Sequence, residues 1–319
     1  MNVALKTRSL SKTFEIGKRL IGPPRALVRA VRPVTMEVAE GETLGIVGES
    51  GCGKSTLARM LVGLEPPSDG EIEIAGQALD RADAASFGRR IQYVFQDPIS
   101  SLNPRKTVRQ IMETPLRRLH GMDRKARRAR IAEIFESVNL REEFLERYPH
   151  EFSGGQAQRI GIARALAAQA RILVLDEPVS ALDVSVQAQV LNLLSDLKSE
   201  FGLTYLFISH DLAVIEAVSD RVMVLYFGAV VETGPAEQIF NAPRHPYTRL
   251  LAQSAPVVGK PLTAPEQKDT ELPDPLAPPP GCAFAGRCPR ASDLCHREDP
   301  PLEDMGDSQF AACHHPLEG

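Results

Sequence analysis

Apolar residues follow two different periods along the first 255 residues of the chain. Four short runs have the composition of buried strands, at Thr43–Val47, Ile91–Phe95, Ile172–Leu175 and Tyr205–Ile208. Helical patterns lie between and around these runs, at Lys54–Leu64, 123–139, 156–169 and 185–200. The last of these helices is expected to bury one apolar face, formed by Val186, Val190, Leu193, Leu194 and Leu197. Since strands that alternate with helices build parallel sheets with crossover helices, the sequence predicts an α/β fold.

Proline and cysteine mark the boundaries of the remaining segments. Residues 256–280 hold eight prolines and few apolar side chains, which predicts an irregular linker with little helix or sheet. Residues 281–319 form a short tail that contains four of the five cysteines. We therefore expect a main domain over 1–255, a proline-rich linker over 256–280 and a cysteine-rich tail over 281–319.

Charge and hydropathy exclude two classes of function. The 319-residue chain has 37 basic and 41 acidic residues, so its net charge of −4 provides no basic field to recruit nucleic acid. Its longest apolar stretch, Val222–Val231, has ten residues, whereas a bilayer span needs about 20. The N-terminus lacks the apolar core of a secretory signal. We expect no transmembrane helix and a cytoplasmic protein, in which structural disulfides are rare.

A phosphate-binding loop is the first candidate site. The sequence GESGCGKS fits G-x-x-x-x-G-K-[ST] and lies between a predicted strand and a predicted helix. Its glycines allow backbone N–H groups to turn toward one point, where the helix N-terminus adds positive potential. Lys54 supplies a charge for the β- and γ-phosphates, and the Ser55 hydroxyl can ligate Mg²⁺. The expected nucleotide-binding residues of this P-loop are Gly48, Glu49, Ser50, Gly51, Cys52, Gly53, Lys54, Ser55 and Thr56.

Two acidic residues follow the apolar run at Ile172–Leu175, in the sequence ILVLDEP. Ligands of open α/β sheets bind at the carboxyl ends of the strands, where Asp176 and Glu177 would lie. Asp176 suits Mg²⁺, bound through water, and Glu177 suits a general base that orients and deprotonates an attacking water. The alternative is a surface turn after a strand. Next to a P-loop, the acidic pair favours a Walker-type hydrolase of a nucleoside triphosphate.

A third motif, Phe152-Ser153-Gly154-Gly155-Gln156, precedes a predicted helix and begins a Gln-x-x-Arg sequence. Ser153 lies 99 residues after Lys54 and 23 residues before Asp176. With this spacing the motif resembles the signature of ATP-binding cassette (ABC) ATPases, although Phe152 stands where leucine is commoner. The resemblance implies a RecA-like parallel sheet with an antiparallel β subdomain, and an α-helical subdomain over about residues 97–165.

The same resemblance assigns roles to four further residues. Gln96, in VFQDP, matches the glutamine that senses Mg²⁺ and the γ-phosphate, and His210, in FISHD, matches the switch histidine. Asp183, in SALD, matches the loop that contacts the opposite subunit, and Phe14, in SKTF, matches the aromatic residue that stacks on adenine. Taken alone, His210 would be a structural histidine and Phe14 a core residue. The Mg²⁺ ligands implied in this way are Ser55, Gln96 and Asp176.

Longer segments narrow the resemblance. Residues 95–105, 177–194, 203–212 and 243–251 are similar to the ATP-binding subunits of oligopeptide/dipeptide permeases, and more so to the second of their two ATPases. This implies an importer subunit, peripheral to the cytoplasmic face of the inner membrane, that uses ATP and Mg²⁺ to energise uptake of peptides. Its partners would be two transmembrane permease subunits, a second ABC ATPase and an extracytoplasmic solute-binding protein. The family also handles nickel, glutathione and opines, so the solute stays open.

In such ATPases two subunits dimerise head to tail across two nucleotides. One subunit would supply Lys54, Ser55, Gln96, Asp176, Glu177 and His210, and the opposite subunit would supply Ser153 and Gly155. A heterodimer with the second ATPase is expected, with a homodimer as the alternative. The alternative function is a soluble ABC ATPase of DNA repair or translation. The short spacing between Lys54 and Ser153, without coiled coils, and the single cassette argue against it.

The tail presents Cys282-x₅-Cys288-x₆-Cys295-x₁₇-Cys313. Four thiols in a segment with too little apolar content for a core of its own favour a bound metal that supplies folding energy. Zinc usually takes more closely spaced pairs, whereas an iron–sulfur cluster accommodates wider spacings, and the spacing alone leaves both open. Similarity to the permease ATPases implies a structural [4Fe–4S] cluster on these four cysteines, with Zn²⁺ as the alternative.

Overall fold

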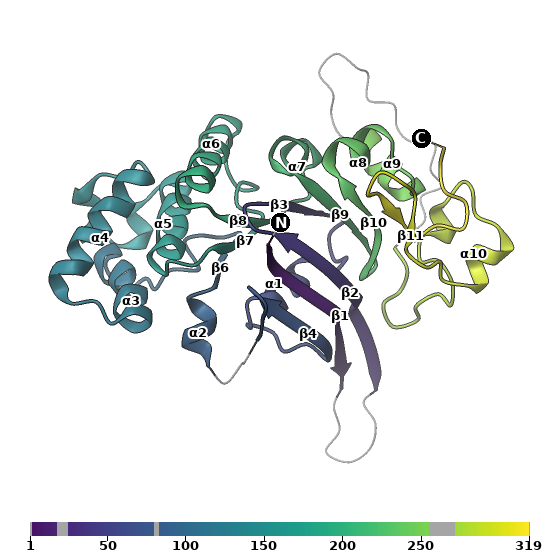
Figure 1. Cartoon of the computed structure of the whole chain (residues 1–319), viewed down its shortest axis with the longest axis horizontal. Helices are drawn as coiled ribbons and strands as arrows, with labels where there is room; N and C mark the ends of the chain where they lie inside the picture. Colours follow the sequence, from purple (N-terminus) through teal and green to yellow (C-terminus); the bar gives the residue numbers. More distant parts are fainter. Residues whose placement is uncertain (1, 18–24, 80–82, 255–271, 319) are drawn as a thin grey trace.

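Two β-sheets form the centre of the structure (Figure 1), a computed structural model that describes residues 2–17, 25–79, 83–254 and 272–318. The main sheet has the strand order β11-β12-β10-β9-β3-β8-β7-β6. Strands β9, β3, β8, β7 and β6 run parallel to one another, whereas β10, β12 and β11 continue the sheet in antiparallel pairs. The bounds of these strands are β3 Thr43–Val47, β6 Ile91–Val94, β7 Ile172–Asp176, β8 Thr204–Ile208, β9 Arg221–Tyr226, β10 Ala229–Pro235, β11 Glu303–Asp304 and β12 Phe310–Ala311.

A second, antiparallel sheet lies beside the main one, with the order β2-β1-β4-β5. Its bounds are β1 Val3–Ile16, β2 Ala26–Ala39, β4 Asp69–Ile74 and β5 Gln77–Ala78. Strands β1 and β2 are long and irregular, with several register shifts along their pairing. The expected combination of a parallel sheet with an antiparallel β subdomain, and with it the α/β fold, is confirmed.

The four helices that the sequence predicts are present, and further helices lie between and after them. Their bounds are α1 Lys54–Leu61, α2 Ala84–Gly88, α3 Val108–His120, α4 Arg124–Ser137, α5 Gly154–Ala167, α6 Val184–Phe201, α7 Leu212–Val218, α8 Ala236–Asn241, α9 Pro246–Ser254 and α10 Asp293–Arg297, with 3₁₀ turns η1 Glu142–Glu146, η2 Pro149–Glu151 and η3 Ala285–Arg287. Helix α1 ends three residues earlier than expected, before Gly63, whose φ of 71° is the left-handed conformation that stops helices.

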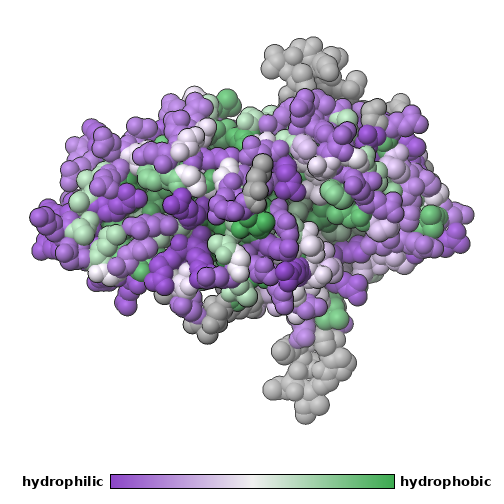
Figure 2. All heavy atoms as spheres, viewed as in Figure 1, coloured by the Kyte–Doolittle hydropathy of each residue, from purple (hydrophilic) through white to green (hydrophobic). Residues whose placement is uncertain are grey.

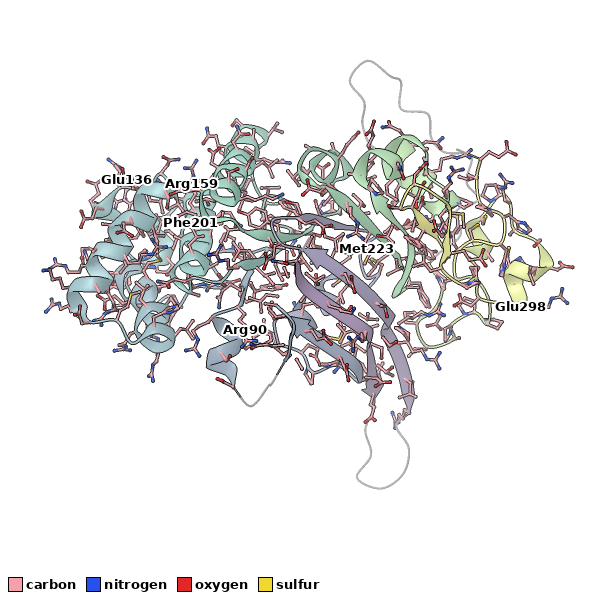
Figure 3. The ribbon with its side chains drawn as sticks, in the orientation of Figure 1. Arg90, Glu136, Arg159, Phe201, Met223 and Glu298 are labelled. Carbon is pink, nitrogen blue, oxygen red and sulfur yellow. The ribbon has the colours of Figure 1, made fainter. Side chains whose placement is uncertain are left out.

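Helices α3, α4 and α5 pack on one another at one end of the molecule (Figure 1). Arg159 on α5, labelled in Figure 3, donates to the carbonyl of Val138 after α4 (3.2 Å) and to the side chain of Gln189 on α6 (3.3 Å). This arginine therefore ties the helical end to α6, which follows the acidic pair of β7. The tail lies at the opposite end, where Glu298 is labelled.

Two apolar cores cover the two faces of the main sheet. Along β7, Leu173 and Leu175 face the core that includes helices α3–α6, whereas Ile172 and Val174 face the core shared with the antiparallel sheet and α1. Strands buried on both faces read as continuous apolar runs. For this reason the runs predicted from the sequence coincide with β3, β7 and β8. Met223 on β9, labelled in Figure 3, belongs to the second core.

The tail joins the main core instead of folding as a separate unit. Strand β12 pairs with β10, and Phe284 is only 1% exposed and packs against Tyr226 and Tyr247. The apolar side chains of the tail are few, as expected: Phe284 and Leu317 are buried, whereas Leu294, Leu302 and Phe310 are exposed. The linker prediction falls partly outside the described residues, and residues 272–280, which are described, contain no helix or strand.

Hydrophilic side chains dominate the face seen in Figure 2, with hydrophobic residues in smaller patches between them. In the described ranges, no helix has the length and apolar character needed to cross a bilayer.

Candidate nucleotide site

The P-loop follows β3 in the middle of the main sheet, and close backbone packing explains its glycines. Gly48 has φ 152°, and a Cβ there would lie 2.2 Å from the carbonyl oxygen of Leu225. Gly53 precedes α1 with φ 103°, and a Cβ there would lie 2.3 Å from the carbonyl oxygen of Ala30. A side chain at either position would push the loop away from the sheet.

Lys54 lies buried inside this loop, only 6% exposed. Its ammonium group donates to the backbone carbonyls of Gly48 (2.6 Å) and Glu49 (3.0 Å). Burial raises the pKa of the neighbouring Cys52 thiol, which keeps that thiol protonated and unreactive. The loop therefore closes around its own lysine, which sits at the N-terminus of α1 where anions bind.

Asp176 ends β7 beside α1, 4% exposed. Ser55 Oγ donates to Asp176 Oδ1 (3.2 Å), so two of the three expected Mg²⁺ ligands are neighbours. Tyr93 Oη donates to the other oxygen, Oδ2, from the adjacent parallel strand β6. Burial, followed by the hydrogen bond to Asp176, raises the pKa of Tyr93, so the phenol stays a donor at all ordinary pH values. Tyr93 lies outside the motifs that the sequence identifies.

Replacing Tyr93 with phenylalanine is expected to raise the Mg²⁺ concentration needed for half-maximal ATPase activity by about fivefold to tenfold, since one charge-assisted hydrogen bond that orients Asp176 is lost. Maximal turnover at saturating Mg²⁺ should change much less. A Mg²⁺ titration of ATPase activity measures both. Tyr205, a second buried tyrosine whose hydroxyl donates to the carbonyl of Leu194 instead, provides the matched control, Tyr205→Phe. An unchanged Mg²⁺ requirement in Tyr93→Phe would contradict the role.

Glu177, the next residue, brings three expected catalytic side chains together. Its φ of 48° is left-handed, which costs a non-glycine residue about 1–2 kcal/mol and is characteristic of functional sites. Gln96 Nε2 donates to Glu177 Oε2 (2.9 Å), and His210 Nδ1 lies 3.2 Å from the same oxygen. The His210 side chain is 59% exposed, against 16% for Glu177, so histidine faces solvent over a more sheltered carboxylate.

The signature residues lie on other elements. Ser153 caps α5: its hydroxyl accepts from the N–H of Gln156 (3.4 Å), and the Gln156 side chain accepts from the N–H of Ser153. A Cβ on Gly155 would lie 2.5 Å from Val186, so the signature packs tightly against the start of α6. Asp183, which precedes α6, is exposed. Within the residues that the structure describes, no hydrogen bond joins this group to the P-loop.

Phe14 is also separate from the P-loop residues. It lies near the end of β1, is 37% exposed and has the Lys12 ammonium 4.8 Å from its ring centroid. A ring with this exposure is accessible to a stacking partner. Phe14 is therefore not a core residue, which was the alternative interpretation.

The four tail thiols line one small cavity, together with His245, His314 and His315. Burial raises the pKa of Cys282 to about 11 and also raises the pKa values of Cys288 and Cys313. No group of three or more His, Cys, Asp or Glu side chains among the described residues is arranged to hold a metal ion. The side chains as placed therefore form no metal site, although the four thiols border the same cavity.

Two family models match the chain. One, described as ABC transporter, matches residues 31–180, and the other, described as oligopeptide/dipeptide transporter, C-terminal region, matches residues 231–295. The second match starts within β10 and stops at Cys295, so it does not coincide with the tail.

Curated relatives resemble the chain along almost its whole length. A putative peptide import ATP-binding protein of Brucella abortus is 50% identical over 315 residues, which cover 97% of this chain and 93% of the relative. The dipeptide transport ATP-binding protein DppF of Haemophilus influenzae is 47% identical over 315 residues, covering 98% and 96%. DppF of Escherichia coli is 48% identical over 313 residues, covering 97% and 93%.

Solved structures agree with the sequence relatives. A dimeric ATP-binding cassette, MJ0796, in a post-hydrolysis state bound to ADP and Pi, has a TM-score of 0.64 at 31% identity, covering 73% of this chain and 98% of that one. The cbiO1 protein of Clostridium perfringens has a TM-score of 0.64 at 26% identity, covering 76% and 92%. By these relatives, the chain belongs to the ATP-binding proteins of the ABC transporter family that carry the oligopeptide/dipeptide transporter C-terminal region.

Proposed function

We propose that the chain is the ATP-hydrolysing subunit of an ABC importer that energises uptake of dipeptides or oligopeptides through separate membrane permease subunits. One observation carries the hydrolytic part: Gln96 and His210 meet on Glu177 Oε2, one residue after a carboxylate that contacts the P-loop serine. The peptide part rests on relatives that are themselves peptide import or transport proteins. None of these named relatives supports the DNA-repair or translation alternative.

Each side chain of the site has a proposed role. Lys54 neutralises the β- and γ-phosphates, and the P-loop N–H groups bind their oxygens. Ser55, Gln96 and Asp176 would hold Mg²⁺, which would polarise the phosphoryl group. Glu177 takes the proton of the attacking water, and His210 contacts the γ-phosphate. Phe14 stacks on adenine.

The second half of each site is proposed to come from another ABC ATPase. Ser153, Gly154, Gly155 and Gln156 stand at the exposed N-terminus of α5, where backbone N–H groups bind phosphate. Their separation from the P-loop within one chain supports a head-to-tail dimer, with Asp183 at its interface. We propose a heterodimer, two permease subunits and a solute-binding protein, with the chain held peripherally at the cytoplasmic face of the inner membrane.

Uptake by the complete transporter tests this function. The chain, a second ATPase and the permease subunits are reconstituted in vesicles with a solute-binding protein, and uptake of a labelled dipeptide is followed. Uptake that requires both ATP and dipeptide-loaded binding protein is expected. Labelled nickel and glutathione are the comparison solutes, and uptake of either without dipeptide uptake would overturn the peptide assignment.

For the tail, we propose a [4Fe–4S] cluster held by Cys282, Cys288, Cys295 and Cys313. Their position around one cavity supports it. A zinc ion at about 2.3 Å from each sulfur would draw the sulfurs to within about 4 Å of one another. A cluster of several irons would separate its thiolates more widely, and among the described residues the side chains as placed are arranged for neither group. The cluster would replace the thiol protons and supply folding energy to a segment with few apolar residues.

Protein purified without oxygen is expected to be brown and to absorb broadly near 400 nm, as thiolate-bound iron clusters do. The Cys288→Ser variant should lose this colour together with its iron. Cys52→Ser is the matched control, because Cys52 lies in the P-loop and not in the tail. This variant should keep both the colour and the iron. Colourless protein with one equivalent of zinc and no iron would overturn the cluster and assign the four thiols to zinc.

A further inference from the structure

Glu49, the first variable residue of the P-loop, is contacted by residues from the C-terminal part of the chain. The backbone N–H of Glu49 donates to Tyr247 Oη on α9 (2.9 Å), and its carbonyl accepts from Lys54 (3.0 Å). Its carboxylate forms a bidentate pair with Arg287, with Nη1 to Oε2 at 2.8 Å and Nη2 to Oε1 at 2.9 Å. Glu49 therefore contacts the nucleotide-binding lysine on one side and the C-terminal tail on the other.

The Arg287–Glu49 pair is sheltered and well oriented. The two side chains are 15% and 27% exposed, and the Arg287 guanidinium lies 5.9 Å from the ring of Tyr226 and 5.7 Å from the ring of Phe284. Planar guanidinium groups favour this two-point contact with carboxylate, and shelter from water strengthens it relative to a surface ion pair. The pair joins residues 238 positions apart in sequence.

The tail's cysteines set the position of Arg287. It ends the 3₁₀ turn η3 (Ala285–Arg287), which lies between Cys282 and Cys288. The turn begins with Ala285 N–H donating to the carbonyl of Cys282 (3.0 Å) and ends with Cys288 N–H donating to that of Ala285 (3.3 Å). Cys282 N–H in turn donates to the carbonyl of Cys295 (2.8 Å). The arginine that reaches the P-loop thus stands on a turn framed by the thiol cavity.

We propose that Arg287 is a positioning residue for ATP binding, through which the cysteine-rich tail holds the P-loop in place. A chemical change at the tail thiols should therefore alter the affinity of the P-loop for ATP. A fixed Glu49 keeps its carbonyl, and with it the Lys54 ammonium, in one place, and preorganisation of the loop lowers the entropy lost on binding phosphate. The proposal rests on the nucleotide site acting as proposed above.

The first experiment compares Arg287→Met with wild type in the full-length chain. Isothermal titration with the magnesium complex of the non-hydrolysed analogue AMP-PNP should give a dissociation constant about tenfold higher in the variant, the effect of losing one charge-assisted pair. Arg287→Lys, which keeps one of the two contacts, should recover part of this loss. In the assembled transporter, KM for ATP should rise by a similar factor while kcat stays within about twofold.

Asp299→Asn is the matched control. Asp299 follows Glu298 (labelled in Figure 3) and pairs with Arg32 of β2, a second tail-to-body ion pair that contacts no P-loop residue by a described hydrogen bond. The affinity of the Asp299→Asn variant for the AMP-PNP complex should equal that of wild type. Equal losses in Asp299→Asn and Arg287→Met would reduce the pair to general stabilisation and overturn the proposal. A wild-type chain that binds no nucleotide would instead refute the proposed function.

Two double variants test whether the tail acts on nucleotide binding through the Arg287–Glu49 pair. In Glu49→Gln/Arg287→Met, the loss should equal that of either single variant, because both remove one contact. Cys288→Ser should weaken binding of the AMP-PNP complex in the wild-type background and add less than about twofold in the Arg287→Met background. Additive losses in the first pair, or an undiminished effect of Cys288→Ser without Arg287, would overturn the coupling.

Discussion

The Glu177→Gln variant is expected to bind MgATP normally and hydrolyse it about 10²- to 10⁴-fold more slowly, the usual loss when a general base is removed. The reason is local. Glu177 is the sheltered carboxylate on which Gln96 and His210 converge, and glutamine preserves the shape and the hydrogen bonds of that site but cannot accept a proton. Steady-state ATPase activity of the assembled transporter is the measurement, with Glu216→Gln on the exposed face of α7 as control.

The same variant should accumulate a closed, ATP-bound dimer, because it binds the nucleotide and does not clear it. Size-exclusion chromatography with MgATP detects this species, which should be absent with MgADP. Turnover close to wild type in Glu177→Gln would remove Glu177 from the role of base and leave water activation to another group.

The parallel half of the fold was predictable because its strands are buried on both faces. Thr43–Val47 and Tyr205–Ile208 are apolar without interruption, and the structure places them as β3 and β8 within one residue. Strands β1 and β2 carry a weaker signal. Register shifts and the φ of 47° at Ser9 interrupt the alternation of β1, and in β2 a strict alternation of buried and exposed residues is confined to Val34–Val38.

The residues of the candidate site also differ in whether the sequence alone identifies them. Lys54, Asp176 and Glu177 stand in motifs whose local spacing carries the chemistry, so sequence alone identifies them. Tyr93 and Arg287 reach the site from other elements, and their roles depend on which strands pair and where the tail packs. One weak signal existed for Tyr93: it lies in the apolar run IQYVF, where a buried phenol needs a hydrogen-bond partner. Nothing near Arg287 in the sequence points to residue Glu49.

Substitution of Lys54 is the second change with a large expected effect on nucleotide binding. Because Lys54 is buried, its replacement also affects stability, and the substitution has to be chosen so that the two effects can be separated. Lys54→Ala should weaken binding of MgATP beyond the range of ordinary titration and abolish transport, since the charge for the β- and γ-phosphates is removed. The alanine also leaves the carbonyls of Gly48 and Glu49 without their donor, which costs about 1–3 kcal/mol of stability for each buried acceptor left unpaired.

Lys54→Gln separates these two effects. Its amide can still donate to the loop carbonyls, so the thermal unfolding temperature should lie closer to wild type than that of Lys54→Ala, while the loss of nucleotide binding should be as severe. Lys125→Ala, which removes an exposed lysine at the start of α4, should alter neither property. If Lys54→Gln recovers nucleotide affinity along with stability, the lysine acts by shaping the loop, and its charge is not what binds phosphate.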